Sequence, residues 1–366
     1  MIGNIARRPW SSFPSTAGAA GAKVRQRATR RWTDRMNLTE PLRTPIRGSD
    51  ASARFAEIRT FLQDHLVGAD ALVERLLVGL LADGHVLLEG PPGLAKTRAV
   101  KLLARALDLS FARIQCTPDL MPADITGTSI WRQDKTIFEF AAGPIFHSLL
   151  LVDEINRAPP KVQSALLEAM AERQATIAGA THALPDPFMT VATQNPIEHE
   201  GTFPLPEAQL DRFMLHVELA LPDAETERRI LDLVEREEQG EPAAPPAALD
   251  AEEIAAARHA AKSVFLSAAV KDYIVRLVTA PRDAKIAPEL AAKIEHPSSP
   301  RGTLALAAAA KARAFLDRRD YVSPQDVSEL AVDVLSHRTI LGWRALAEGE
   351  TPRAIIRAYL DAVPPA

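Results

Sequence analysis

An eight-residue loop, Gly90-Pro91-Pro92-Gly93-Leu94-Ala95-Lys96-Thr97, constrains this chain more than any other feature. It follows the short apolar run 85–88 and precedes a helical pattern that begins near Arg98, which is the strand–loop–helix setting that a phosphate-binding loop requires. In such a loop the backbone N–H groups point at the phosphates, and the N-terminus of the helix adds partial positive charge. We expect Lys96 to reach the β- and γ-phosphates of a nucleotide and the Thr97 hydroxyl to ligate Mg²⁺. A glycine turn that binds no ligand is the alternative for this segment taken alone.

One residue of the loop departs from the usual pattern. Ala95 occupies the position before the lysine, where such loops normally have glycine. Because a Cβ atom disfavours positive φ, we expect Ala95 to keep a negative φ and the chain to be entering the helix there.

Two carboxylates follow a second apolar strand, the run 149–152. In parallel α/β sheets, ligands bind at the C-terminal ends of the strands. There Asp153 would hold magnesium through water, and Glu154 would act as the general base that polarises the attacking water. Two acids can also simply cap a strand. About fifty residues after a lysine-bearing phosphate loop, however, they indicate an ATPase.

Three further polar residues are candidates for catalysis. Asn195 follows the apolar run 188–193 and would orient the attacking water or sense the γ-phosphate, although Asn-Pro is also an ordinary loop signal. Arg212 precedes the strand 213–217 and is a candidate finger that stabilises transition-state charge, in this chain or across a subunit boundary. Arg301 precedes an alanine-rich helix and is a candidate second sensor, although an arginine near a helix start is commonly only solvated.

In this order and spacing, these segments resemble the AAA+ ATPases and, within them, the MoxR group. The resemblance rests on the loop with alanine before its lysine and on the segments 152–158, 192–196, 205–213 and 299–302, and it covers roughly residues 52–345. It implies a ring-forming, chaperone-like ATPase, a homo-hexamer that uses ATP and Mg²⁺ to remodel or activate client proteins. The clients of this group are often cofactor-dependent enzymes, and a von Willebrand factor A domain protein often works beside it.

The resemblance also implies a set of nucleotide contacts, with Val67 and Gly68 against the adenine. The expected cofactor-binding residues are Val67, Gly68, Gly90, Pro91, Pro92, Gly93, Leu94, Ala95, Lys96, Thr97 and Arg98. The expected metal ligands are Thr97 and Asp153.

The expected fold is an α/β AAA+ core over residues 51–222 and an α-helical lid over residues 223–366. The resemblance implies a parallel five-stranded sheet with the order 5-1-4-3-2. Periodicity predicts lid helices near 251–262, 267–280, 301–318 and 324–335. The segments 130–140 and 175–184 read as β-hairpins, which we expect either to contact clients or to serve only as packing.

Charge is distributed unevenly along the chain. The formal charge is −4, but residues 1–48 hold ten Lys or Arg and two acids, so the remaining 33 basic and 45 acidic residues give −12. An acidic body argues against nonspecific nucleic-acid binding. A DNA-linked AAA+ motor or transcriptional activator nevertheless stays open as an alternative, as does a small-molecule kinase or GTPase with a stand-alone phosphate loop.

Residues 1–50 are basic and lack periodicity, which predicts a disordered segment. A true start at Met36 and a targeting peptide are the other interpretations. The single cysteine, Cys116, is expected as a small buried hydrophobe on the second strand and allows no disulfide within the chain. Because no apolar run approaches the ~20 residues of a membrane helix, we expect a cytoplasmic protein with no membrane segment.

Overall fold

The computed structural model describes residues 48–134, 136–196, 201–240, 245–246 and 249–365. The expectations for the basic N-terminal segment fall outside these residues, except that residues 48–50 begin the first helix. The described residues from 48 onward belong to one compact unit.

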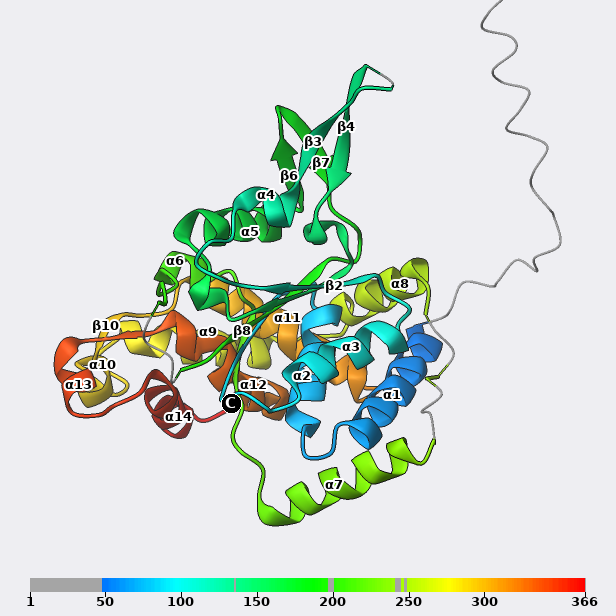
Figure 1. Cartoon of the computed structure of the whole chain (residues 1–366). Coiled ribbons are helices and arrows are strands. Elements are labelled where there is room, and N and C mark those ends of the chain that lie inside the picture. The colour runs from blue at the N-terminus through cyan, green and yellow to red at the C-terminus, as the bar shows by residue number, and fades with distance from the viewer. Residues whose placement is uncertain (1–47, 135, 197–200, 241–244, 247–248, 366) are drawn as a thin grey trace, which may run out of the picture. The chain divides into compact units, whose positions relative to one another are not determined.

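A five-stranded parallel sheet forms the centre of the ATPase-like part of the chain (Figure 1). Its strands are β1 (Val86–Glu89), β2 (Phe111–Gln115), β5 (Leu149–Asp153), β8 (Met189–Gln194) and β9 (Leu215–Glu218). They lie in the order β2-β5-β8-β1-β9, and every neighbouring pair is parallel. When the five strands are numbered one to five in chain order and read from the β9 edge, their order is 5-1-4-3-2. The predicted strand order is therefore confirmed.

Side-chain alternation along the strands creates two apolar cores, one on each face of the sheet. Helices α1 (Gly48–His65), α2 (Asp70–Leu81) and α3 (Lys96–Ala106) cover one face and pack on residues such as Leu149 and Leu151. Helix α5 (Pro160–Glu172) covers the other face and packs on Leu150 and Val152. Since all of β5 is buried, its apolar residues hold its acidic C-terminal end in a fixed place.

Two β-hairpins extend from the α5 face of the sheet, at the top of Figure 1. The first pairs β3 (Gly127–Arg132) with β4 (Ile137–Ala142) after the short helix α4 (Pro122–Thr126). The second pairs β6 (Gln174–Ile177) with β7 (Ala180–Ala183). Both predicted hairpins are therefore confirmed. The ring of Phe140 stacks on that of His182 with centroids 4.1 Å apart, so the two hairpins contact each other near their bases.

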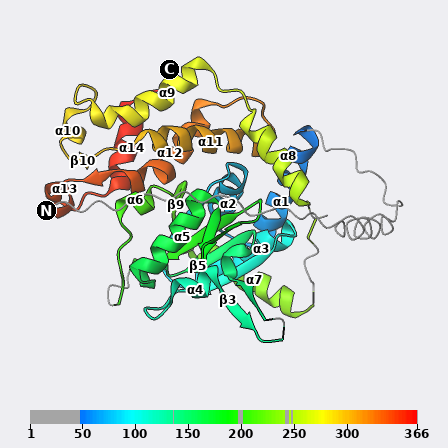
Figure 2. The ribbon, with the colours of Figure 1, turned by 90° about the horizontal axis from the view of Figure 1, so that it is seen from above.

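The C-terminal part is mainly helical, as predicted, and lies beside the sheet in Figure 2. Its longer helices are α7 (Ala224–Glu238), α8 (Ala251–Lys262), α9 (Ala268–Thr279), α11 (Pro300–Leu316), α12 (Pro324–Leu335) and α14 (Pro352–Ala362). Ser323 caps α12 by accepting a hydrogen bond from the Asp326 N–H, with Pro324 in the first turn, as its sequence indicates. The helical part shares an apolar core with α1 and α2.

Several C-terminal elements were not predicted from the sequence. These are α10 (Pro288–Ala291), α13 (Trp343–Ala347), α14, and the antiparallel pair β10 (Ile294–His296) with β11 (Ile340–Leu341). Helix α14 packs on α12 and buries Tyr359 completely.

Candidate active site

The loop between β1 and α3 has the backbone of a phosphate cradle. Gly93 has a φ of +88°, and a Cβ atom there would meet nothing within 4 Å, so this part of the loop is open to a ligand. Ala95 has a φ of +51°, which contradicts the expectation of a negative φ. Helix α3 begins only at Lys96, and the sharp turn into it requires the left-handed conformation at Ala95. That conformation costs a residue with a Cβ about 1–2 kcal/mol, which explains why glycine is usual here.

Lys96 lies in the first turn of α3 and faces the acidic end of the sheet. Its Nζ donates a hydrogen bond to the Gly90 carbonyl at 2.7 Å. The pKa of Lys96 is lowered by burial, and the carboxylates of Asp153, Glu154 and Glu89 offset part of that shift. The ammonium group is therefore half-buried among negative charges, in the place where phosphate oxygens need a cation.

Asp153 is a buried carboxylate at the end of β5, with two partners from neighbouring strands. Thr193 Oγ1 donates to Asp153 Oδ1 at 3.2 Å, and Arg113 Nε donates to Asp153 Oδ2 at 2.6 Å. The hydroxyl of Thr193 also accepts the Glu154 N–H at 3.0 Å. Thr193 thus fixes the relative position of the two acids.

Glu154 follows with a φ of +57°, so the chain turns sharply as it leaves the strand. Its carboxylate accepts a hydrogen bond from Gln115 Nε2 at 3.0 Å and lies 3.3 Å from Arg157 Nε. These two partners hold the carboxylate at the rim of the site. To act as a base toward water, it must release at least one of them.

Sequence reasoning did not single out Arg113, Gln115, Arg157 or Thr193. A signal for the first two exists, because Arg113 and Gln115 are two apart on β2 and therefore share one face of the sheet. In the parallel register Gln115 lies opposite Asp153, which places both side chains beside the two acids. The polar alternation of this short strand could have identified them.

A cavity of about 410 Å³ collects the predicted residues of the loop and of three strand ends. It is lined by Pro92, Gly93, Leu94, Ala95, Lys96, Thr97, Arg98, Arg113, Gln115, Asp153, Glu154, Thr193 and Asn195. Asn195 is buried at the end of β8, in the same layer as the acids, as expected from its place in the sequence. Of the remaining loop residues, Gly90 contributes its carbonyl to Lys96.

The two residues expected at the adenine lie on the other side of Arg98. Val67 lines a separate cavity of about 430 Å³ between the end of α1 and α7. Gly68 has a φ of +75°, and a Cβ atom there would overlap the methyl group of Thr226 at the start of α7. The turn that carries both residues is therefore closely covered by α7.

Arg212 and Arg301 do not line either of these cavities. Arg212 directly follows Asp211 in the chain, and the Asp211 carboxylate is 3.3 Å from Arg301 Nε. The side chain of Arg338 is only 3% exposed and holds the same turn. Its guanidinium donates to Asp211 Oδ1 at 2.8 Å and to the carbonyl of Phe213 at 2.6 Å. Sequence reasoning missed Arg338, and no local pattern distinguishes it.

The residues of the first cavity fit a magnesium–triphosphate group. The Thr97 hydroxyl and the Asp153 carboxylate supply hard oxygen ligands, Lys96 supplies a cation, and Gly93 leaves open space at a helix N-terminus. Mg²⁺ bound with phosphates needs only one or two protein ligands. Among the residues that the structure describes, no group of three or more His, Cys, Asp or Glu side chains could hold a metal ion.

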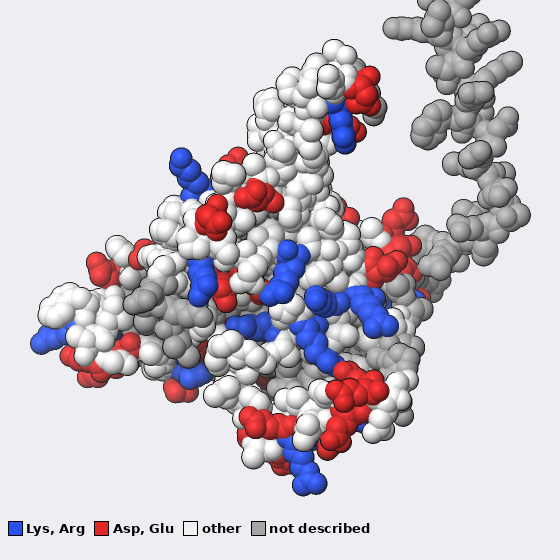
Figure 3. All heavy atoms as spheres, viewed as in Figure 1, with Lys and Arg blue, Asp and Glu red and all other residues white. Residues whose placement is uncertain are grey.

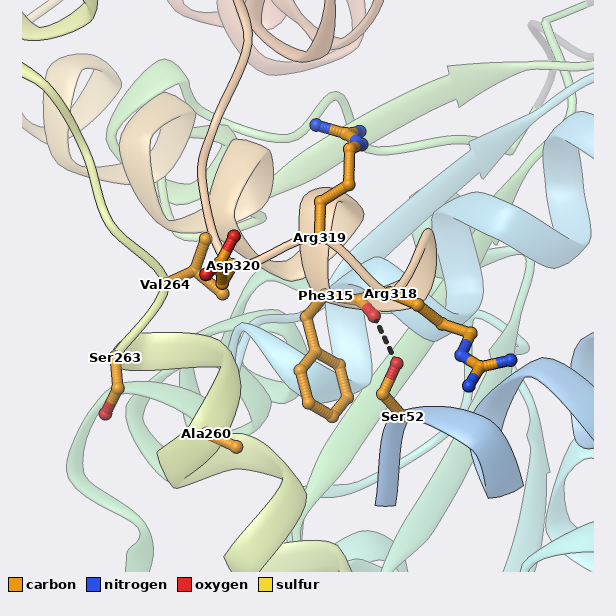
Figure 4. A pocket seen from close by; sticks show the side chains of 8 residues that line it. All are labelled: Ser52, Ala260, Ser263, Val264, Phe315, Arg318, Arg319 and Asp320. Atoms are coloured by element: carbon orange, nitrogen blue, oxygen red, sulfur yellow. Dashed lines mark hydrogen bonds between the residues drawn. The ribbon is translucent and has the colours of Figure 1, made fainter. Parts of the chain in front are cut away.

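A third cavity, of about 430 Å³, contains none of the predicted site residues (Figure 4). It lies where α1, α8 and the end of α11 meet. Ser52 Oγ donates to the Phe315 carbonyl at 2.8 Å, and Arg319 points away toward Asp326. Since it contains none of the loop and strand-end residues that line the first cavity, we assign it no part in the site.

Comparisons with known proteins agree with this geometry. The sequence profile of the ATPase family associated with various cellular activities (AAA) matches residues 85–215, and the profile of the AAA lid domain matches residues 288–359. Within the described residues, no helix is long and apolar enough to cross a membrane.

Several relatives match most of the chain. Chaperone MoxR1 of Mycobacterium tuberculosis is 46% identical over 81% of this chain and 78% of its own length. Protein YeaC of Bacillus subtilis is 43% identical over 81% of this chain and 90% of its own. Protein MoxR of Methylorubrum extorquens is 31% identical over 86% of this chain and 95% of its own length. A crystal structure of a candidate ATPase from Cytophaga hutchinsonii superimposes with a TM-score of 0.80 at 41% identity, covering 87% of this chain and 97% of that one. The chain therefore belongs to the MoxR family of AAA+ ATPases.

Proposed function

We propose that this ATPase uses hydrolysis of Mg²⁺-ATP to remodel or activate client proteins, and that it works as a homo-hexameric ring. The observation that carries the chemical part is the convergence of the loop 92–98 with the ends of β2, β5 and β8 on one cavity. That cavity brings together a phosphate cradle, a lysine, two adjacent acids and an amide. No comparable set lines the other cavities described above.

Each residue has a distinct part in the proposed reaction. Lys96 and the loop amides bind the phosphate oxygens, and Thr97 and Asp153 hold the metal ion, which neutralises charge on those oxygens. Asn195 orients the attacking water. Glu154 accepts the proton of that water after it leaves Gln115 or Arg157, the two partners that now hold its carboxylate.

The positions of Arg212 and Arg301 support a ring. Both lie outside the cavity of their own chain, and the Arg212 side chain makes no ion pair or hydrogen bond among the described residues. We infer that a neighbouring copy receives Arg212 at its γ-phosphate. Because Arg301 shares Asp211 with that turn, it would act on the same neighbouring site.

The hairpins supply a surface for clients. At the end of the β3–β4 hairpin, Trp131 and Phe138 lie opposite each other, with 49% and 70% of their surface exposed. Ile130 and Ile137 are also exposed there. Figure 3 shows that the projecting hairpins carry few charged side chains, apart from a group near the tip. An exposed apolar patch of this kind suits contact with another protein.

The names of the relatives support the proposed role in client remodelling. One is called a chaperone and others are called MoxR, which supports client remodelling as the purpose of hydrolysis. We place the protein in the cytoplasm, where ATP is available, with a client that is a cofactor-dependent enzyme and a von Willebrand factor A domain protein as a partner.

Two variants test the chemical assignment. Glu154→Gln should bind ATP normally and lose turnover by on the order of 10²–10⁴-fold, because the general base is removed while the cradle is kept. Lys96→Ala should lose ATP binding. Glu168→Gln, on the exposed face of α5, is the matched control and should behave as wild type. Loss of ATP binding in Glu154→Gln equal to that in Lys96→Ala would contradict these roles.

A further inference from the structure

The phosphate cavity has a neighbour on the far side of Arg98. This second cavity, of about 430 Å³, is lined by residues 63–65 at the end of α1, by Val67 and by one face of α7. Arg98 lines the first cavity, and its ion-pair partner Glu237 lines the second. The Arg98–Glu237 pair therefore lies at the junction of the two cavities.

Helix α7 is held by few contacts. Of its fifteen residues only Leu233 is buried, and Figure 1 shows it apart from the other helices, below α1 and α3. Its first turn is fixed where Asp223 caps Thr226 and where the methyl group of Thr226 covers Gly68. Its last turn is fixed by Glu237. Since Glu237 lies eleven positions after Thr226, these two attachments lie about 16 Å apart along the helix.

The attachment at Glu237 has a specific geometry. Arg98 Nη1 donates to Glu237 Oε2 at 3.0 Å, and Arg98 Nη2 donates to the other oxygen of the same carboxylate. The hydrogen bond from Arg98 lowers the pKa of Glu237. Arg98 Nε in turn donates to the carbonyl of His65 at 3.3 Å. One guanidinium thus joins the start of α3, the end of α1 and the end of α7.

We propose that Glu237 is a positioning residue that holds α7 against Arg98, so that α7 forms the outer wall of the nucleoside part of the nucleotide site. This inference rests on the proposed ATP site. Phosphates bound at the start of α3 leave the nucleoside to extend past Arg98 toward Val67, into the second cavity. With both ends of α7 attached, this cavity is covered. Without the attachment at Glu237, the helix is held over the cavity only by its Thr226 end and by the buried side chain of Leu233.

The test compares a ligand that has a nucleoside with one that does not. In a Glu154→Gln background, which prevents hydrolysis, the dissociation constants of ATP and of inorganic tripolyphosphate are measured by calorimetry. Adding Glu237→Gln should weaken ATP binding about two- to fivefold and leave tripolyphosphate binding unchanged. An effect of this size is expected because the Arg98–Glu237 contact is bidentate and its side chains are only about one-third exposed. Arg98→Lys, which keeps the charge but loses the two-point contact, should also weaken ATP.

Glu235→Gln is the matched control, since Glu235 lies on the exposed side of the same helix. It should leave both constants unchanged. At 1 M salt, the dissociation constant of ATP for the Glu237→Gln protein should approach that for the parent protein, because screening weakens the ion pair. Melting temperatures measured in parallel establish that each variant is folded.

Three outcomes would overturn the inference. Equal weakening of ATP and tripolyphosphate would mean that the pair supports the phosphate loop rather than α7. Unchanged ATP binding in a folded Glu237→Gln protein would mean that the pair does not hold the wall. Weakening by the Glu235→Gln control would mean that charge on α7, not the contact, matters. Failure of the parent protein to bind ATP would instead refute the proposed function on which the inference depends.

Discussion

Replacing Arg338 by methionine should loosen the turn that carries Arg212 without disturbing the ATP cavity. The Arg338 side chain is 3% exposed and donates to the Asp211 carboxylate and to the carbonyls of Asp211, Phe213 and Met214. Burial lowers the pKa of Arg338 to about 10, with the Asp211 carboxylate opposing the shift, so the residue stays charged at neutral pH. Methionine is similar in length but cannot donate any of these hydrogen bonds.

The size of the effect follows from the burial of this pair. Removing one partner of a buried ion pair costs about 3–5 kcal/mol. Because Asp211 is 23% exposed and retains Arg301 at 3.3 Å, we expect the lower end, about 3 kcal/mol in the free energy of unfolding. For a chain of 366 residues that corresponds to a fall of about 4 °C in melting temperature. ATP turnover should fall about 10- to 100-fold through misplacement of Arg212, with the ATP dissociation constant unchanged.

The assay pairs calorimetric melting with ATP binding and steady-state turnover well below the melting temperature. Arg344→Met is the matched control, since this lid arginine is 84% exposed and should tolerate the same change. A melting temperature within 1 °C of wild type would refute the energetic reasoning. A lower melting temperature with normal turnover would show that the contacts of Arg338 are structural and do not position Arg212.

Three further predictions concern single residues. His85 is buried and accepts a hydrogen bond from the Thr190 N–H. Burial is the main cause that lowers the pKa of His85 to about 3 in the folded protein. As the pH falls below about 6.5, the imidazole of His85 therefore becomes protonated only in the unfolded chain. Stability should therefore be lost toward acid, and between pH 7 and 5 a His85→Gln protein should lose about 2 kcal/mol less than wild type in urea unfolding. Arg113→Ala should tighten Mg²⁺ about two- to fivefold in a titration of the ATP-bound protein, because a cation 2.6 Å from Asp153 is removed; weaker Mg²⁺ binding would contradict this. Cys116 is 1% exposed, and burial raises its pKa to about 12, so the folded protein should resist iodoacetamide at pH 8, whereas rapid labelling would show that this part of the core opens.

Much of the core could be predicted because local and global signals agree there. The run 149–152 is apolar throughout and forms a strand buried on both faces, so its length and the two following acids indicate both its place and its function. The serine–proline pair at 323–324 predicts the start of α12 for a similar reason, because cap and first turn are adjacent in the sequence. The strand order, in contrast, follows from the family resemblance rather than from these patterns.

The remaining features depend on contacts between residues far apart in the sequence. Ala95 was expected to avoid positive φ on steric grounds, but the turn into α3 imposes it. Arg338 meets the turn at Asp211 across 127 residues of chain, and Arg98 meets Glu237 across 139, so no window of sequence contains either pair. Helix α14 was missed because its apolar face becomes meaningful only once α12 is in place against it.

A mixture of two inactive variants tests most directly whether a neighbouring copy completes the catalytic site. An Arg212→Ala subunit keeps its own Lys96, while a Lys96→Ala subunit keeps Arg212. Each pure variant should be inactive, the first through loss of transition-state stabilisation and the second through an empty site. In randomly mixed rings about one site in four combines an intact Lys96 with a neighbour's Arg212, so an equimolar mixture should recover up to about a quarter of wild-type ATPase activity. If the subunits demonstrably exchange and no activity returns, Arg212 does not act on a neighbouring subunit, and the ring mechanism is contradicted.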